Sequence, residues 1–128
     1  MKRRINTSVL EKKKKKLQHL LKLDNWTINI KFVPKSRLPD ERTTAQVDYC
    51  SCSERVASVV IYDKYWLHDG FEVAWNLETL LLHEFIHILL MEQFMHLPHM
   101  IQENAKFMEL EEFICDIFAK IIFDTYNS

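Results

Sequence analysis

The sequence predicts a small α+β domain with an N-terminal helix, a three-stranded sheet and two C-terminal helices. Its 128 residues suffice for one domain spanning residues 1–128 and are too few for two ordinary ones. Apolar residues make up 48% and aromatic residues 12% of the chain, which excludes a mainly disordered protein. There are three prolines and a single glycine, Gly70. So few helix breakers favour long helices, and a glycine-rich phosphate loop is excluded.

Charge is divided between the two ends of the chain. Residues 1–37 carry a net charge of +10, and residues 38–128 carry −11. The basic end could contact nucleic acid, but the run Lys12–Lys16 has no interleaved aromatic residues, which favours a solvated helix face. We find no apolar segment long enough to cross a membrane and no apolar signal core. We therefore expect a cytoplasmic protein without membrane contact, with Cys50, Cys52 and Cys115 as reduced thiols.

Hydrophobic periodicity predicts the elements of the first half. An amphipathic, basic helix is expected over residues 5–23, ended by Asp24 and Asn25. Three strands follow, at residues 26–33, 43–51 and 55–62, and the last is the richest in β-branched residues. Residues 34–39 and 63–71 are expected to be loops.

The second half is predicted to be helical. Asn76 is a plausible N-cap for a helix that runs to about Met95. The sequence His-Leu-Pro-His at 96–99 interrupts the pattern, and a final helix is expected from about Met100 to Tyr126. The order of elements suggests an antiparallel or mixed sheet, with the helices on one side of it.

The motif H-E-x-x-H at residues 83–87 carries the chemical information. On a helix, His87 lies about 40° and Glu84 about 100° around the axis from His83. The other nine residues of segment 80–91 are apolar, and burying three polar side chains among them without partners would cost several kcal/mol. A divalent metal compensates most simply, because two imidazoles one turn apart can bind one tetrahedral ion. Glu84 is then placed to take a proton from metal-bound water. The alternative is a pair of core histidines bonded to carbonyl groups.

The last helix offers a third ligand. Glu112 lies within a stripe of small and apolar residues, whereas Glu109 falls in a polar sector. An uncompensated carboxylate would be costly there, so Glu112 is the expected ligand. Asp116, one turn later, could accept a hydrogen bond from a ligating histidine. Glu111 and His99 remain alternatives to Glu112. A second, fully apolar face holds Phe107, Leu110, Ile114, Ile117, Phe118 and Ile121.

The pattern His83-Glu84-x-x-His87, followed by Glu112-x-x-x-Asp116, resembles the gluzincin branch of the zincin metallopeptidases. The resemblance implies one zinc ion (Zn2+) held by His83, His87 and Glu112, with Glu84 as the catalytic base and Asp116 orienting His83. The overall plan also resembles the minimal ImmA/IrrE-type and phage-borne zincins. The metzincin pattern fails, because Leu90 and Gln93 stand where it needs glycine and histidine. SprT-like zincins take a third histidine from about the region of His99.

The resemblance implies a zinc-dependent peptidase acting on a peptide or protein substrate. By the same resemblance, strand 55–62 would lie at the edge of the sheet beside the cleft, where an extended peptide could pair with it. Nothing selects an oxyanion-stabilising donor among Tyr62, His68, His99 and Tyr126. Iron uses similar ligands, so the metal is favoured as zinc and not fixed. The alternative function is a metal-binding regulatory or nucleic-acid-associated module without proteolytic activity.

Overall fold

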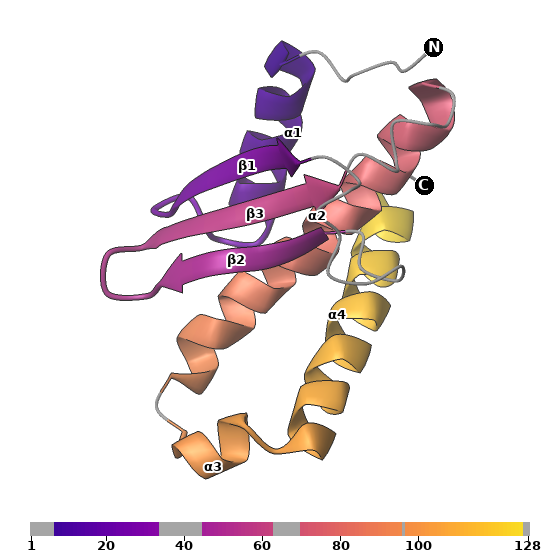
Figure 1. Cartoon of the computed structure of the whole chain (residues 1–128). Coiled ribbons are helices and arrows are strands. Elements are labelled where there is room, and N and C mark those ends of the chain that lie inside the picture. Colours follow the sequence, from indigo (N-terminus) through magenta and orange to yellow (C-terminus); the bar gives the residue numbers. More distant parts are fainter. Residues whose placement is uncertain (1–6, 34–44, 63–69, 96, 127–128) are drawn as a thin grey trace.

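The computed structural model describes residues 7–33, 45–62, 70–95 and 97–126, and it has the predicted α+β fold (Figure 1). The elements in chain order are α1 (Thr7–Leu20), β1 (Thr27–Val33), β2 (Ala45–Ser51), β3 (Val56–Tyr62), α2 (Gly70–Phe94), α3 (His99–Gln102) and α4 (Ala105–Tyr126). The predicted loop at 34–39 and residues 63–69 of the predicted loop at 63–71 lie outside the described residues, whereas residues 70 and 71 belong to α2. None of the described helices is long and apolar enough to span a bilayer.

The sheet is mixed, with the strand order β1-β3-β2. β1 pairs with β3 in parallel, and β2 pairs with β3 antiparallel with a bulge between Val47 and Tyr49. The expectation that strand 55–62 lies at an edge is therefore wrong, because β3 is the central strand. Its nearly continuous run of buried residues suits a strand with a partner on both sides. β2 is the edge strand that packs against α2.

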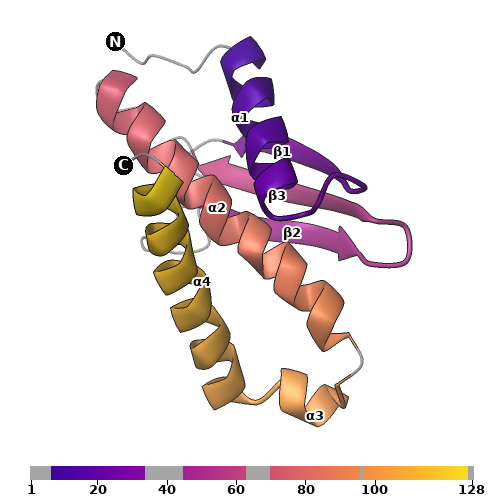
Figure 2. The same cartoon turned by 180° about the vertical axis from the view of Figure 1, so that it is seen from behind.

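The helices cover one face of the sheet, with α1 and α2 in front of the strands when the molecule is seen from behind (Figure 2). α2 is the central helix: it contacts α1, β2 and α4, and α4 runs back along it in the opposite direction (Figures 1 and 2). One core joins the layers. It contains Leu17 of α1, Ile28 of β1, Val59 and Ile61 of β3, Leu81, Leu82, Phe85 and Ile88 of α2, and Cys115 and Ala119 of α4. α2 is thereby held by the core on several sides.

The end of α1 is a Schellman motif. Leu23 N–H donates to the Gln18 carbonyl at 2.7 Å and Lys22 N–H to the His19 carbonyl at 3.2 Å. Lys22 takes the left-handed conformation, φ 60°, that this motif needs and that glycine usually supplies. The buried Gln18 amide then donates to the carbonyls of Leu23 and Trp26. These bonds set the path from α1 into β1.

Ion pairs join α1 to α2. The buried carboxylate of Glu78 pairs with Lys16 at 3.0 Å and Lys13 at 3.4 Å. Burial alone would raise the pKa of Glu78, but the two ammonium groups hold it below its ordinary value. Lys14 donates to the carbonyl of Ile28 and pairs with Glu11. Three of the five lysines in the run are thus bound within the molecule, which leaves fewer charges for a nucleic acid.

Three helix boundaries differ from the predictions. α1 ends at Leu20 and not at residue 23, because Lys22 takes the left-handed conformation two residues before the predicted stop at Asp24. α2 begins at Gly70, six residues before the predicted N-cap Asn76, because no residue between them interrupts a helix. The final helix is divided into α3 and α4. Asn104 separates them by capping α4: its side-chain oxygen accepts hydrogen bonds from the backbone N–H groups of Lys106 and Phe107, at 2.9 and 3.2 Å.

Candidate metal centre

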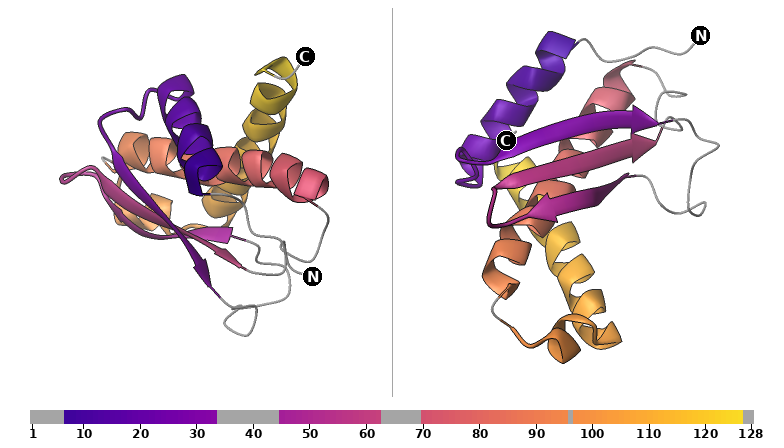
Figure 3. Two further views of the ribbon diagram at one scale, coloured as in Figure 1. Left: turned by 90° about the horizontal axis from the view of Figure 1, so that it is seen from above. Right: turned by 60° about the vertical axis from the view of Figure 1, so that its left-hand side comes forward.

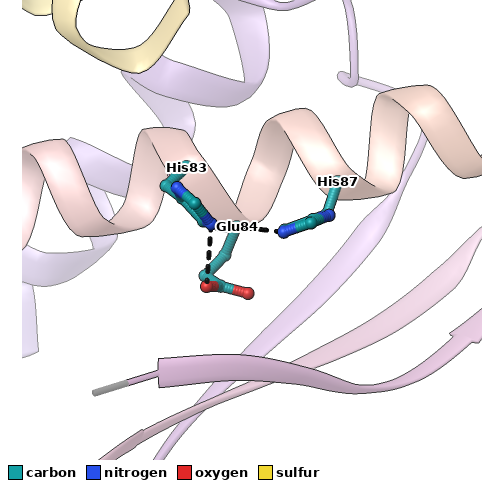
Figure 4. Close-up of side chains that lie close together, drawn as sticks. All are labelled: His83, Glu84 and His87. Carbon is teal, nitrogen blue, oxygen red and sulfur yellow. Dashed lines mark hydrogen bonds and ion pairs between the residues drawn. The ribbon is translucent and has the colours of Figure 1, made fainter. Parts of the chain in front are cut away.

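α2 places the two motif histidines one turn apart on the face that α4 covers. Their Nε2 atoms are 3.2 Å apart, and the rings meet edge to face with centroids 4.9 Å apart. Glu84 extends toward the sheet, and its carboxylate still lies close to His83 (Figure 4). The ligand atoms of all three residues lie within 4.8 Å of one another. The local cause is the helical repeat, which brings residues i and i+4 together.

α4 brings Glu112 to both histidines. One carboxylate oxygen lies 3.2 Å from Nε2 of His83, and the other lies 2.8 Å from Nε2 of His87. Two nitrogen ligands of a tetrahedral zinc ion, each about 2.0–2.1 Å from it, lie about 3.3 Å apart. The three separations of 2.8–3.2 Å are therefore close to those of a zinc ligand set, and the two-imidazole, one-carboxylate chemistry fits the ion.

A second carboxylate contacts the far nitrogen of each histidine ring. Asp116 lies 2.7 Å from Nδ1 of His83, and Glu111 lies 2.6 Å from Nδ1 of His87. A carboxylate at Nδ1 holds the proton on that atom and leaves Nε2 free to bind a metal. Asp116 thus lies beside the histidine that the resemblance implied. The sequence does not predict the Glu111 contact, because Glu111 is there only an alternative to Glu112 as a ligand. The antiparallel course of α4 explains the contact. His87 lies one turn after His83 on α2, so the residue of α4 that contacts His87 must lie about one turn before Asp116, which contacts His83.

The carboxylates govern the titration of the histidines. Burial alone would lower the pKa of His83, but the hydrogen bond to Glu112 and the charge of Glu84 raise it. Burial would also lower the pKa of His87, but its interactions with Cys115, Glu111 and Glu112 outweigh burial and raise the pKa to about 12. The pKa of Glu112 is held well below its usual range by His83 and His87. In the absence of an ion, protons take its place between these groups.

Glu84 has a different environment from the other acids of the site. Its side chain is buried, and one carboxylate oxygen is 3.9 Å from Nε2 of His83. Burial raises the pKa of Glu84, and the histidines and the Val47 backbone of β2 partly oppose this. A buried carboxylate with a raised pKa, one residue from a candidate metal ligand, is suited to accept and return a proton.

The site is open on the side of α4. The Glu112 side chain is 59% exposed and that of Asp116 is 71% exposed, so solvent reaches the carboxylates from outside. Glu111 and Glu112 line a groove of about 450 Å³. Its other lining residues are largely apolar: Cys52, Met91, Phe94, Met95, Gln102, Phe107 and Met108. Any ligand in this groove lies beside the candidate metal ligand Glu112.

Cys115 was not expected at the site. It is fully buried, contacts His87 electrostatically, and has its own pKa raised by burial. In the sequence it is one of several small residues on its face of the helix, and nothing marks it as a neighbour of His87. Its thiol is a small, weakly polar filler next to the imidazole.

The structure does not bring every predicted residue together. The side chain of His99 lies outside the described residues, and its backbone is in α3, beyond the C-terminal end of α2 (Figure 1). His68 and the side chain of Tyr126 also lie outside them. Tyr62 is buried in β3, where its hydroxyl accepts a hydrogen bond from Gln46 at 3.1 Å. No oxyanion-stabilising donor is thereby singled out.

Comparison of the chain with protein-family models, with curated proteins and with solved structures found no match. The residues of the site and their geometry are therefore the evidence for its function.

Proposed function

We propose that this protein is a zinc-dependent metallopeptidase of the gluzincin type, with one zinc ion held by His83, His87 and Glu112. The observation that carries the proposal is that the two histidine Nε2 atoms lie 3.2 Å apart and each lies 2.8–3.2 Å from one oxygen of the Glu112 carboxylate, with a further carboxylate behind each histidine. A core pair of histidines would need hydrogen-bond acceptors, but it would not need two separate carboxylates at Nδ1 and a third between the Nε2 atoms.

Each residue has a distinct task in this proposal. Zinc, when bound, supplies a Lewis acid that polarises the substrate carbonyl and lowers the pKa of water. Glu84 accepts the proton of the attacking water and returns it to the leaving amine. Burial raises the pKa of Glu84 toward neutral pH. A base with such a pKa can both accept a proton from water and give it up to the amine. Asp116 and Glu111 hold the two imidazoles in one tautomer and orientation.

Two features support a peptide as the substrate. β2 is an edge strand, and Glu84 interacts with its backbone at Val47, so an extended peptide paired with this edge would run beside the base. Glu111 and Glu112 line the apolar groove, which is large enough for a bulky side chain. We propose that the main chain follows β2 and that one apolar side chain enters the groove.

The proposed enzyme works in the cytoplasm. All three cysteines are free, and the thiols of Cys50 and Cys52 are only two residues apart. Free thiols suit a reducing compartment. There Cys115, next to His87, would stay a thiol and would not form a disulfide.

The metal part of the proposal is tested by zinc titration of the wild type and of two variants of the same helix. Glu112→Ala should lower zinc affinity by more than the roughly 10–100-fold expected for an orienting residue. Glu109→Ala, a matched change one turn away on the exposed side of α4, should leave it unchanged. Equal affinity in the wild type and Glu112→Ala would remove Glu112 from the ligand set.

The catalytic part is tested with zinc-loaded protein and a fluorescently labelled casein. Glu84→Gln should keep one zinc per chain and reduce the rate of hydrolysis by about 10²–10⁴-fold, because only the proton acceptor is lost. Full activity of Glu84→Gln would refute the mechanism. If the wild type binds zinc tightly and cleaves neither casein nor a mixed peptide library, the metal-binding module without proteolysis becomes the better function.

A further inference from the structure

Among the described elements, α4 has the most exposed large apolar side chains, and most of them lie on its outer face. α4 packs on α2 through its opposite face, where Cys115 and Ala119 are buried. The outer stripe consists of six large apolar residues: Leu110, Phe113, Ile114, Ile117, Phe118 and Ile121. Five of the six side chains are 40–62% exposed, and Ile114 is half-buried. Seen from above, this part of α4 projects beyond the layer of the sheet (Figure 3).

The outer stripe is symmetrical along the helix. Its members form three pairs, each equidistant from the midpoint between Cys115 and Asp116: Leu110 with Ile121, Phe113 with Phe118, and Ile114 with Ile117. A second copy of α4 laid antiparallel on the first would therefore bring Leu110 to Ile121, Phe113 to Phe118 and Ile114 to Ile117. Such a self-complementary patch is what a two-fold interface requires.

The charges beside the stripe obey the same symmetry. Lys106, Glu109, Lys120 and Asp124 are exposed and lie along one flank. A two-fold axis perpendicular to an antiparallel helix pair keeps the same flank of both helices on the same side. Lys106 of one copy then lies within two residues of the level of Asp124 of the other, and Glu109 within two of Lys120. In a parallel pair this flank would instead face the opposite flank of the partner, and these pairings would be lost.

We propose that two copies of this chain associate through the outer stripe of α4 as an antiparallel, two-fold symmetric helix pair. The occupant of the apolar face is the same face of a second copy, because both its apolar pattern and its charges complement themselves. The stripe lies on the other side of α4 from Glu112 and Asp116, so the dimer leaves the candidate metal centre open. The proposal is independent of the peptidase function.

Sedimentation of the full chain over a concentration series tests the dimer. The wild type should shift from monomer to dimer, and Ile117→Asp should raise the dissociation constant at least about 10-fold, because each dimer then buries two carboxylates. The control Met100→Asp changes an apolar side chain that is 79% exposed but lies in α3, and it should have no effect. A wild type that stays monomeric throughout, or equal effects of the two variants, would overturn the proposal.

Charge exchange tests the antiparallel register without touching the apolar residues. Lys120→Glu should weaken association, because it then lies beside Glu109 of the partner copy. Adding Glu109→Lys to the same chain should restore it, since both cross-pairs are re-formed with their signs exchanged. If the single variant has no effect, or the double variant is weaker still, the antiparallel pairing is wrong. Far-ultraviolet circular dichroism of each variant checks that the fold is retained.

Discussion

His87 is the residue on which the candidate centre depends most. It contacts His83 and Glu112 through Nε2, Glu111 through Nδ1, and Cys115 at its side. All these neighbours come from one turn of α2 and two turns of α4. The imidazole therefore has a single orientation and a carboxylate at each nitrogen. This arrangement either holds a proton on each nitrogen or exchanges one of them for an ion.

The competition between proton and ion predicts a pH dependence. In metal-free protein the pKa of His87 is raised from 6.5 to about 12, so the folded state binds more protons than the unfolded state between these values. The free energy of unfolding should therefore fall as pH rises above about 6.5, by about 1–2 kcal/mol between pH 6 and 8. Urea unfolding with a chelator measures this.

With saturating zinc the same decline should be absent, because metal-bound Nε2 carries no proton to lose. Zinc-loaded protein is thus the internal control for the titrating groups outside the site. An equal decline in both forms would show that His87 is not the origin.

The carboxylates behind the rings give a separate prediction. Glu111→Gln and Asp116→Asn should each weaken zinc binding about 10–100-fold and keep a stoichiometry of one, since the amide no longer fixes the imidazole tautomer. Competition with a chromogenic chelator measures the affinity. Asp124→Asn, on the exposed end of the same helix, is the control. Unchanged affinity in Glu111→Gln would mean that its 2.6 Å contact with His87 does not orient a metal ligand.

Helical arithmetic was sufficient to locate part of the site. It predicted that Glu112 faces the approaching helix and that Asp116 follows it on nearly the same side, and both lie against His83 in the structure. It could not assign Glu111 a partner, because Glu111 lies at the border of two faces and its contact depends on how α4 slides along α2. The nearness of Cys115 to His87 depends on the same interhelical register. The metal and catalytic roles of these residues stay predictions.

At the scale of elements, the end of α1 offers a test of local conformation. Lys22 has a φ of 60°, which costs a residue with a Cβ about 1 kcal/mol relative to glycine. Lys22→Gly should therefore raise the free energy of unfolding by about 0.5–1 kcal/mol. The same substitution at the exposed Lys15, within α1, should lower it by about 1 kcal/mol. Thermal or urea unfolding distinguishes the two, and destabilisation by both would contradict the Schellman assignment.

The types of the long elements followed from periodicity, but their ends did not. The three strands begin within two residues of their predicted starts, because β-branched and apolar alternation marks them directly. The break at Glu103 and Asn104 was missed. The segment from residue 100 onward has an unbroken apolar pattern, and only the hydrogen bonds of the Asn104 side chain show that a new helix starts there.

At the scale of the molecule, composition and element order were sufficient to predict the α+β class. The order of the strands was not predictable, because nothing in the sequence of β3 indicates which strands pair with its two edges. The uncovered face of α4 was also beyond reach: its six apolar residues have the pattern of a core face, and the chain folds the smaller Cys115 and Ala119 inward instead. Small residues allow α2 and α4 to approach closely enough for short histidine–carboxylate contacts.

The candidate ligands are held by the helices α2 and α4, whereas Glu84 also contacts the sheet, and this difference has a consequence for mutations. Every group proposed to hold or orient the ion lies in the hairpin of α2 and α4, within residues 83–116, whereas Glu84 alone leans on the sheet. A change that disrupts the edge strand β2 would remove the backbone contact that positions Glu84. The ligands on α2 and α4 would keep their places. In the proposed enzyme, a change in β2 would therefore abolish hydrolysis and leave zinc binding intact.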